Sequence, residues 1–266
     1  MAGSLVRIED PADPRISAYV NVRERDLVGR VGQFIAEGEV VLRVLVGPRS
    51  RCRVVSLLVA ANRLERLADL TDALDAATPV YVASSAVMDA VVGFPIHRGL
   101  LAVGERPADP GVEALLADLP ASALVMGLVG ISNHDNIGGL FRNAAAFGVA
   151  AVLVDPHCCD PLYRKAIRVS VGAALTVPFA RLDEGEDMLA ALSEARFTLF
   201  ALSPSGVEPL AAVRRPHRAA ILLGAEGDGL PQAILDRCRT VAIPMAAGWD
   251  SLNVAAASAI ALHALA

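Results

Sequence analysis

Apolar residues recur along residues 121–266 in a pattern that predicts strands separated by helices. Near-continuous apolar runs predict the strands, and apolar positions at helical spacing predict the helices between them. The predicted strands are residues 124–129, 150–154, 198–202, 220–223 and 241–243, and the predicted helices are residues 137–147, 161–170 and 252–265. Apolar strands that alternate with helices are typical of a parallel sheet covered on both faces, so we expect an α/β fold.

A shorter α/β pattern precedes this region. Its predicted strands are residues 54–60 and 80–82, its predicted helices are residues 63–76 and 85–92, and residues 40–46 form a further apolar segment. The Pro- and Gly-containing stretch at residues 105–111 indicates a linker. We therefore expect a small α/β substrate-binding domain over residues 1–106, a linker over residues 107–120 and a second domain over residues 121–266.

Composition narrows the class of protein. A hydrophobic content of 54% supports a sizeable core without disulfides or metal. No apolar run approaches the roughly 18 residues of a membrane span, and no secretory signal is visible, so we expect a cytoplasmic protein. The four cysteines lack a C-x-x-C spacing, so we expect no metal site, and the adjacent Cys158 and Cys159 are typical of small buried residues. The net charge of −5 restricts any nucleic-acid site to a local patch.

Three segments of the second domain carry polar residues in an otherwise apolar setting. Asn136 and Arg142 lie in the helix that follows the first predicted strand. Glu226 lies in a Gly-rich acidic loop after the strand at residues 220–223. The third segment, residues 251–253, follows an apolar strand that ends in a Pro-Met turn at residues 243–245. The turn after the first strand lacks G-x-G-x-x-G, so we do not expect an ordinary dinucleotide site.

Helix formation alone does not explain the polar residues of the third segment. Ser251 is a suitable N-cap for the last helix, because its hydroxyl oxygen can accept a backbone N–H bond. Asn253 is a poor helix former inside the predicted first turn. A functional role would account for it.

Taken in this order, the three segments resemble the signature motifs of the SpoU (TrmH-like) RNA ribose methyltransferases of the SPOUT superfamily. The resemblance implies a deep C-terminal trefoil knot that binds S-adenosylmethionine, methyl transfer to a ribose 2′-hydroxyl of tRNA or rRNA, and a homodimer formed through the knotted domain. It implies that the catalytic residues are Arg142, Asn136, Glu226, Ser251 and Asn253. It implies that the cofactor-binding residues are Leu202, Gly224, Glu226, Gly227, Ile243, Met245 and Leu252. His134 and Asp135 precede Asn136, where many relatives carry a proline, so the rigidity of this loop and the role of His134 stay open.

Arg142 is the residue that the resemblance places at the target nucleotide. A guanidinium stays protonated at physiological pH, so we expect Arg142 to stabilise the developing alkoxide and hold phosphate rather than remove a proton. Its neighbours Leu140, Phe141 and Ala144 are apolar, which argues against an ordinary surface arginine. The Ala-rich last helix, with Trp249 nearby, is a candidate dimer interface.

Several arginines are candidates for RNA binding. Residues 32–38 resemble the entry of the substrate-binding domain of SpoU proteins, which is similar to a small ribosomal-protein fold. Arg49, Arg51 and Arg53 alternate, so on an extended segment they would share one face and grip phosphate. Arg164 and Arg168 lie at i,i+4 spacing on a predicted helix and would extend the RNA track. A solvated loop and a solvated helix face are the alternatives, and residues 97–98 are a further candidate contact.

Two other functions stay open at this point. One is a non-enzymatic RNA-binding module, and the other is a SPOUT methyltransferase that acts on a base. Binding of S-adenosylmethionine would distinguish a methyltransferase from the non-enzymatic RNA-binding module. The sequence indicates neither the RNA and nucleotide that are modified nor the group that accepts the 2′-hydroxyl proton.

Overall fold

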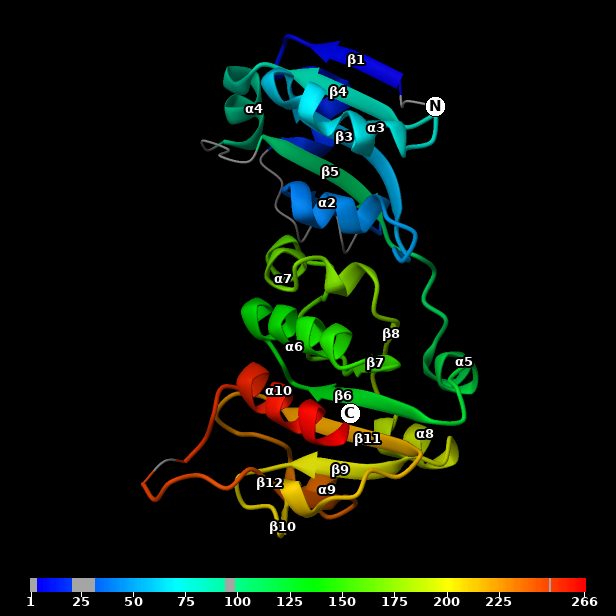
Figure 1. Cartoon of the computed structure of the whole chain (residues 1–266), viewed down its shortest axis with the longest axis vertical. Helices are drawn as coiled ribbons and strands as arrows, with labels where there is room; N and C mark the ends of the chain where they lie inside the picture. Colours follow the sequence, from blue (N-terminus) through cyan, green and yellow to red (C-terminus); the bar gives the residue numbers. More distant parts are fainter. Residues whose placement is uncertain (1–3, 21–31, 94–98, 249) are drawn as a thin grey trace. The chain divides into compact units, whose positions relative to one another are not determined.

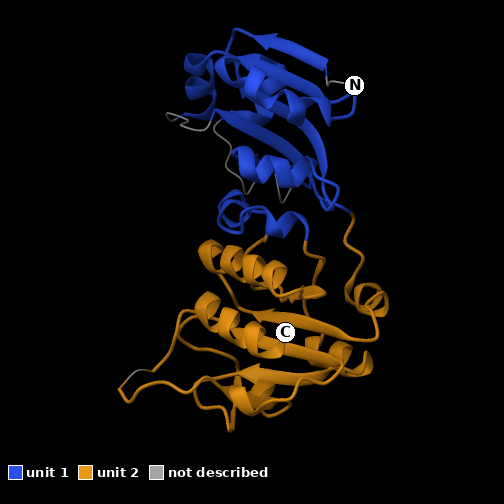
Figure 2. Cartoon of the chain, in the orientation of Figure 1, with its two compact units in different colours: residues 1–107, 162–176 blue, residues 108–161, 177–266 orange. Residues whose placement is uncertain are grey.

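The computed structural model describes residues 4–20, 32–93, 99–248 and 250–266. The chain forms two compact units (Figure 2). Unit 1 contains residues 1–107 and 162–176, and unit 2 contains residues 108–161 and 177–266. The sequence-based division had assigned residues 162–176 to the second domain.

Unit 1 is built on a five-stranded mixed sheet (Figure 1). The strands β1 and β3 flank β4 in parallel, whereas β5 runs antiparallel to both β3 and β2. Tyr19 lies buried under this sheet, where its hydroxyl bonds to Ser56 Oγ at 2.7 Å and accepts the Val103 N–H at 3.2 Å. In sheet order, the strands are β1 (Ser4–Ile8), β4 (Pro79–Ala83), β3 (Arg53–Ala60), β5 (Leu100–Glu105) and β2 (Gln33–Glu37).

The helices of unit 1 are short. The predicted helix at residues 63–76 is instead two 3-10 turns and a single α turn, where the Thr71 hydroxyl donates to the Ala68 carbonyl and competes with helical bonding. The helix at residues 85–92 is present as predicted, with Ser84 as its N-cap. The helical elements are η1 (Pro14–Tyr19), α2 (Glu39–Val46), η2 (Ala61–Arg63), η3 (Glu65–Leu67), α3 (Ala68–Asp72), α4 (Ser85–Val92), α7 (Arg164–Val169) and η4 (Ala173–Leu175).

Unit 2 is an α/β fold around a seven-stranded sheet in which each neighbouring pair is parallel, as the apolar strands predict. The two central strands are almost fully buried, which accounts for their continuous apolar sequences. In sheet order, the strands are β10 (Glu208–Pro209), β12 (Arg239–Ala242), β9 (Thr198–Leu202), β11 (Arg218–Gly224), β6 (Ala123–Val129), β7 (Ala151–Val154) and β8 (Phe179–Arg181).

Helices cover both faces of this sheet (Figure 1). On one face, α5 and α8 pack against Val125, Leu153, Ala201 and Leu222. On the other face, α6 and α10 lie side by side. None of the helices in the described residues is long and apolar enough to cross a membrane. The helical elements of unit 2 are α5 (Val112–Ala117), α6 (His134–Ala146), α8 (Met188–Glu194), η5 (Leu210–Ala212), α9 (Gln232–Leu235) and α10 (Val254–Leu265).

The contact between α6 and α10 depends on small residues and one amide. A Cβ atom added to Gly139 would lie 2.7 Å from the Cβ of Ala255, so the backbones approach more closely than two side chains would permit. Asn143 Nδ2 donates to the Ala255 carbonyl at 2.7 Å and to Ser258 Oγ at 2.8 Å. Because Ser258 is fully buried, these bonds satisfy polar groups that would otherwise be costly.

We expect Gly139→Ala to destabilise unit 2 by about 1–3 kcal/mol, because the added methyl group forces α6 and α10 apart. Chemical denaturation followed by circular dichroism measures this effect. The double substitution Gly139→Ala with Ala255→Gly restores the space and should recover part of the loss. If Ala255→Gly made Gly139→Ala no less harmful, the helix contact would not be the cause.

Candidate functional site

The carboxyl ends of adjacent parallel strands bring three of the predicted cofactor residues to one edge of the sheet (Figure 1). Leu202 ends β9, Gly224 ends β11, and Ile243 directly follows β12. In the sheet, β12 neighbours β9 and β9 neighbours β11. All three residues are half-buried. Ligands of parallel α/β sheets bind at this kind of edge.

The loop after β11 requires glycine. A Cβ atom on Gly224 would lie 2.3 Å from the carbonyl carbon of Gly229, so only glycine fits. The Gly229 N–H donates to the Ala225 carbonyl at 3.1 Å, and Gly227 has a φ of +94°. This tight loop leaves Glu226 exposed at its tip. The family resemblance implies that Glu226 can hold Asn136 or Asn253, but within the described part of the chain its carboxylate accepts no hydrogen bond from either residue.

The two motif asparagines instead bond to each other. Asn253 Nδ2 donates to Asn136 Oδ1 at 2.9 Å, although the residues are 117 positions apart. Asn136 is buried, with 7% of its surface exposed. This bond brings the first and third motifs together directly.

Asn253 is also the N-cap of α10, a role that the sequence had indicated for Ser251. Asn253 Oδ1 accepts the N–H groups of Ala255 at 2.9 Å and Ala256 at 3.4 Å. With a φ of −52° and a ψ of 137°, Asn253 lies outside the helix, so its low helix propensity costs nothing. The expectation for Ser251 was wrong because Asn253, which also bonds Asn136, takes the cap two residues later. Ser251 is exposed in the preceding segment, as is Leu252, and Met245 is half-buried.

The helix α6 presents Asn136 and Arg142 on different sides. Asn133 is its N-cap, with Oδ1 accepting the Asp135 N–H at 2.8 Å. Leu140 and Phe141 are fully buried, but Arg142, which follows them in the chain, is exposed to solvent. Apolar neighbours in sequence therefore did not imply an apolar environment. Arg142 has no hydrogen bond or ion pair with any described residue, which leaves its guanidinium available to a ligand.

The alternation of the arginines at residues 49–53 predicted that they share one extended segment. In the structure they do not. Arg49 is exposed in a turn, which the Ser50 N–H closes onto the Gly47 carbonyl at 3.0 Å. Arg53 begins β3, and its Nε donates to Glu105 Oε2 at 2.9 Å. Arg51 is half-buried between them. The turn changes the chain direction, so the three side chains are not aligned by strand geometry.

The arginines of α7 face an acidic residue of unit 1. Arg164 Nη1 lies 3.9 Å from Glu37 Oε2, and Arg168 Nη1 lies 4.0 Å from the same atom. Glu37 is 9% exposed, so two cations neutralise one nearly buried carboxylate. The candidate contact at residues 97–98 lies outside the described residues, as does Trp249.

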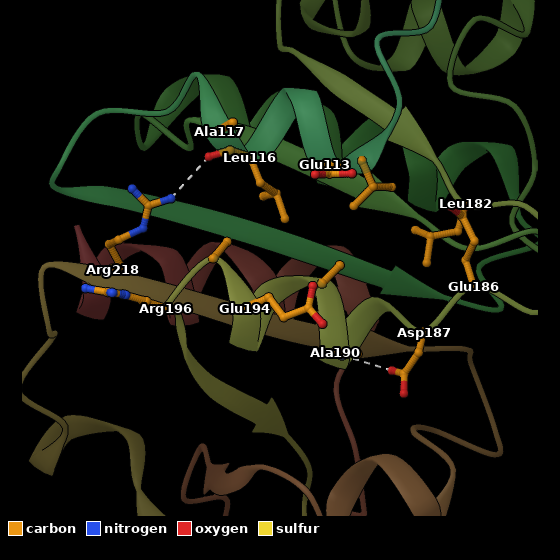
Figure 3. Close-up of a pocket in the computed structure, with 13 residues that line it drawn as sticks. Glu113, Leu116, Ala117, Leu182, Glu186, Asp187, Ala190, Glu194, Arg196 and Arg218 are labelled. Carbon is orange, nitrogen blue, oxygen red and sulfur yellow. Dashed lines mark hydrogen bonds between the residues drawn. The ribbon is translucent and has the colours of Figure 1, made fainter.

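A cavity of about 680 Å³ lies between α5 and α8, away from the motif residues (Figure 3). Acidic residues contribute much of its lining, and Arg218 at one end donates to the Leu116 carbonyl at 3.2 Å. None of the predicted site residues lines this cavity. Its charged lining residues are Glu113, Glu186, Asp187, Glu194, Arg196 and Arg218.

Comparisons with known proteins identify the family of this chain. The model of the SpoU rRNA Methylase family matches residues 123–263. A Mycobacterium tuberculosis protein, named an uncharacterized tRNA/rRNA methyltransferase, is 40% identical over 264 residues, covering 96% of this chain and 89% of the relative. A 23S rRNA (guanosine-2′-O-)-methyltransferase of Vibrio vulnificus is 34% identical over 170 residues, covering 62% of this chain and 68% of the relative.

Solved structures share the fold over nearly the whole chain. An AdoMet-bound rRNA methyltransferase from Sinorhizobium meliloti has a TM-score of 0.79 at 20% identity, covering 99% of this chain and 98% of the other. An RNA 2′-O ribose methyltransferase has a TM-score of 0.77 at 26% identity, covering 98% of both chains. The chain therefore belongs to the SpoU rRNA methylase family and is a methyltransferase.

Proposed function

We propose that this protein transfers the methyl group of S-adenosylmethionine to the 2′-hydroxyl of a ribose in tRNA or rRNA. The observation that carries the proposal is the bond between Asn136 and Asn253, which joins two family motifs beside the carboxyl edge of the sheet. Relatives named for guanosine-2′-O methylation and for RNA 2′-O ribose methylation support the ribose as target.

The residues at the sheet edge suit S-adenosylmethionine. Its adenine is flat and apolar with a hydrogen-bonding edge, and it fits between half-buried apolar residues and main-chain groups. Leu202, Ile243 and Met245 supply apolar surface, and Gly224 lets the loop after β11 fold tightly back against the end of the strand. When bound, the cofactor supplies an electrophilic methyl group on a sulfonium. The trefoil knot that the family resemblance implies stays a prediction.

Arg142 supplies the charge that the reaction needs. As the ribose oxygen attacks, it bonds to the methyl carbon while the sulfur–carbon bond breaks, and its proton leaves to water or to a phosphate oxygen. An exposed guanidinium can donate several hydrogen bonds to phosphate and to the developing alkoxide. Because Arg142 is free of partners within the described residues, it does not have to break an existing ion pair.

Asn136 can orient the target. Its Oδ1 accepts from Asn253, and its Nδ2 makes no hydrogen bond with a described residue. The Asn136 amide therefore keeps two donors for a ribose or a phosphate, and the bond to Asn253 holds them in place. Positioning of this kind contributes several kcal/mol to catalysis.

We expect Arg142→Lys to lower kcat by roughly 100-fold with little change in the Kd for S-adenosylmethionine, because lysine cannot reproduce the fork of donors. The assay transfers radiolabelled methyl groups to total RNA from a strain of the source organism that lacks the gene. Arg239→Lys is the matched control, since Arg239 forms an exposed ion pair with Glu208 at 2.7 Å at the start of β12. Equal rates for wild type and Arg142→Lys at saturating RNA would contradict the role of Arg142.

The same assay identifies the methylated atom. A ribose 2′-O-methyl group removes the nucleophile for alkaline cleavage, so the label should remain in alkali-resistant dinucleotides. Label in alkali-released mononucleotides would indicate a base methyltransferase instead. Saturable RNA binding with neither cofactor binding nor methyl transfer would indicate the non-enzymatic module.

We expect the double substitution Arg49→Ala with Arg51→Ala to weaken RNA binding and to reduce its dependence on salt, because each phosphate contact releases counterions. The slope of log K against log salt should fall by about 1–2, measured by filter binding at several salt concentrations. Arg43→Ala is the control, since Arg43 is already paired with Asp69 at 2.6 Å and with Glu39. An unchanged slope would exclude these two arginines from the RNA interface.

The outward face of α6 and α10 suits a second copy of the chain. Its exposed residues include Ala145 and Ala146 on α6 and Ala256, Ile260 and Ala264 on α10, next to the polar Arg142 and His263. Ile260 has 43% of its surface exposed, which is unusual for a large apolar side chain on a helix. Small residues let helices of two protomers approach closely, so we infer that this face forms the homodimer.

We expect Ile260→Glu to convert the dimer to monomers, because the interface would bury an unpaired charge. Size-exclusion chromatography with light scattering measures the mass. Val207→Glu is the control, since Val207 is 89% exposed in a loop. A dimer of unchanged stability in Ile260→Glu would place the interface elsewhere.

A further inference from the structure

One carboxylate joins the turns that follow two adjacent strands of unit 2. Asp155, which directly follows β7, is 9% exposed. Its Oδ1 accepts the Cys158 N–H at 2.8 Å and the His157 N–H at 3.1 Å within its own turn. Its Oδ2 accepts the Gly130 N–H at 2.9 Å in the turn after β6. Charge-assisted bonds of this kind are roughly twice as strong as neutral ones.

Cysteine and backbone groups join the same two turns again. The Ile131 N–H donates to Cys158 Sγ at 3.1 Å, and the Cys159 N–H donates to the Ile131 carbonyl at 2.9 Å. Burial, followed by the bond to Asp155, raises the pKa of the Cys158 thiol. Cys158 therefore stays a neutral thiol at physiological pH and accepts the Ile131 N–H without bringing a charge into the site.

Arg181, the last residue of β8, holds the turn at residues 155–159 from the other side. Its Nη1 donates to the carbonyl oxygens of Asp155 at 2.9 Å, Cys158 at 3.0 Å and Pro156 at 3.3 Å, and its Nη2 donates to that of Cys159 at 3.2 Å. One guanidinium thus satisfies four backbone acceptors. The second nitrogen of the planar fork extends these bonds to Cys159, which the compact ammonium group of a lysine would not do in addition to the other three.

These bonds converge on the start of the motif helix. Gly130 and Ile131 lead through Ser132 to Asn133, the N-cap of α6, which carries Asn136 and Arg142. The same turn approaches the second motif, since a Cβ atom on Gly130 would lie 3.5 Å from the Cβ of Ala225.

This proximity also has an electrostatic effect. Burial and then Asp160 raise the pKa of Cys159 to about 11, and the Glu226 carboxylate adds to this shift. The turn at residues 155–159 is therefore within electrostatic range of the loop that follows β11.

We propose that Asp155 and Arg181 are positioning residues for methyl transfer, which hold the Gly130–Ile131 turn and through it the start of α6. This inference rests on the proposed function. Neither side chain has to contact RNA or cofactor. Their effect is geometric, since a displacement of about 1 Å in catalytic groups can lower a rate by roughly 100-fold.

Asp155→Asn and Arg181→Lys test the proposal in the full chain. Asp155→Asn keeps the shape but turns one acceptor into a donor that faces N–H groups, and Arg181→Lys keeps the charge but loses the fork. We expect kcat for methyl transfer to total RNA to fall by about tenfold or more in both variants. We expect KM for RNA and for S-adenosylmethionine to change by less than about twofold.

Two controls and a second readout separate positioning from a loss of fold. Glu184→Gln and Arg237→Lys alter exposed charges of the same unit, and their kcat should equal that of wild type. Hydrogen exchange of the Gly130 and Ile131 amides should accelerate in Arg181→Lys, while the amides of β6 keep their protection. A merely structural role would lower the folded fraction and leave kcat per folded enzyme unchanged.

The outcomes are distinguishable from those of the proposed function. An active wild type whose kcat per folded enzyme is retained in Asp155→Asn and Arg181→Lys would overturn the positioning role alone. A wild type that binds S-adenosylmethionine and transfers no methyl group to this RNA would overturn the proposed function, and the positioning role with it.

Discussion

The hydrogen bond between Asn253 and Asn136 is the interaction on which the candidate site depends. It connects the N-cap of α10 to the first turn of α6, so the amide of Asn253 both caps the start of a helix and joins two motifs. The contact of Gly139 with Ala255 and the bonds of Asn143 repeat this connection along the helices. The motif residues are therefore as rigid as the packing of the two helices that carry them.

The parallel sheet explains why the motifs lie where they do. Because neighbouring strands run in one direction, the loops after β6, β9, β11 and β12 all leave the same edge. The end of β11 has no room for a side chain at residue 224, because the backbone of Gly229 folds over it. With a net charge of −5, the protein attracts RNA by local positive patches and not by its overall charge.

The sequence predicted most of the sheet of unit 2, because its central strands are buried on both faces and must be continuously apolar. The strand at residues 198–202 has the predicted bounds. The strands β8 and β10 were not predicted, since three and two residues carry no periodicity. The bonds of Asp155 and Arg181 to neighbouring turns were not predicted either, because their partners are set by neighbouring strands and leave no spacing in the chain. The sequence indicated Ser251 as the N-cap, whereas Asn253 takes this position. The difference depends on the bond of Asn253 to Asn136, a distant residue that local sequence does not reveal.

The separation of Asn136 and Asn253 has a consequence for biosynthesis. At ribosomal rates of about 5–20 residues per second, Asn253 is made roughly 6–23 s after Asn136, which is ample time for local helices and strands to form. Throughout that interval α6 lacks the helix that covers Gly139, and Asn136 lacks its amide partner. A nascent chain can therefore contain a nearly finished sheet while its candidate site is still incomplete.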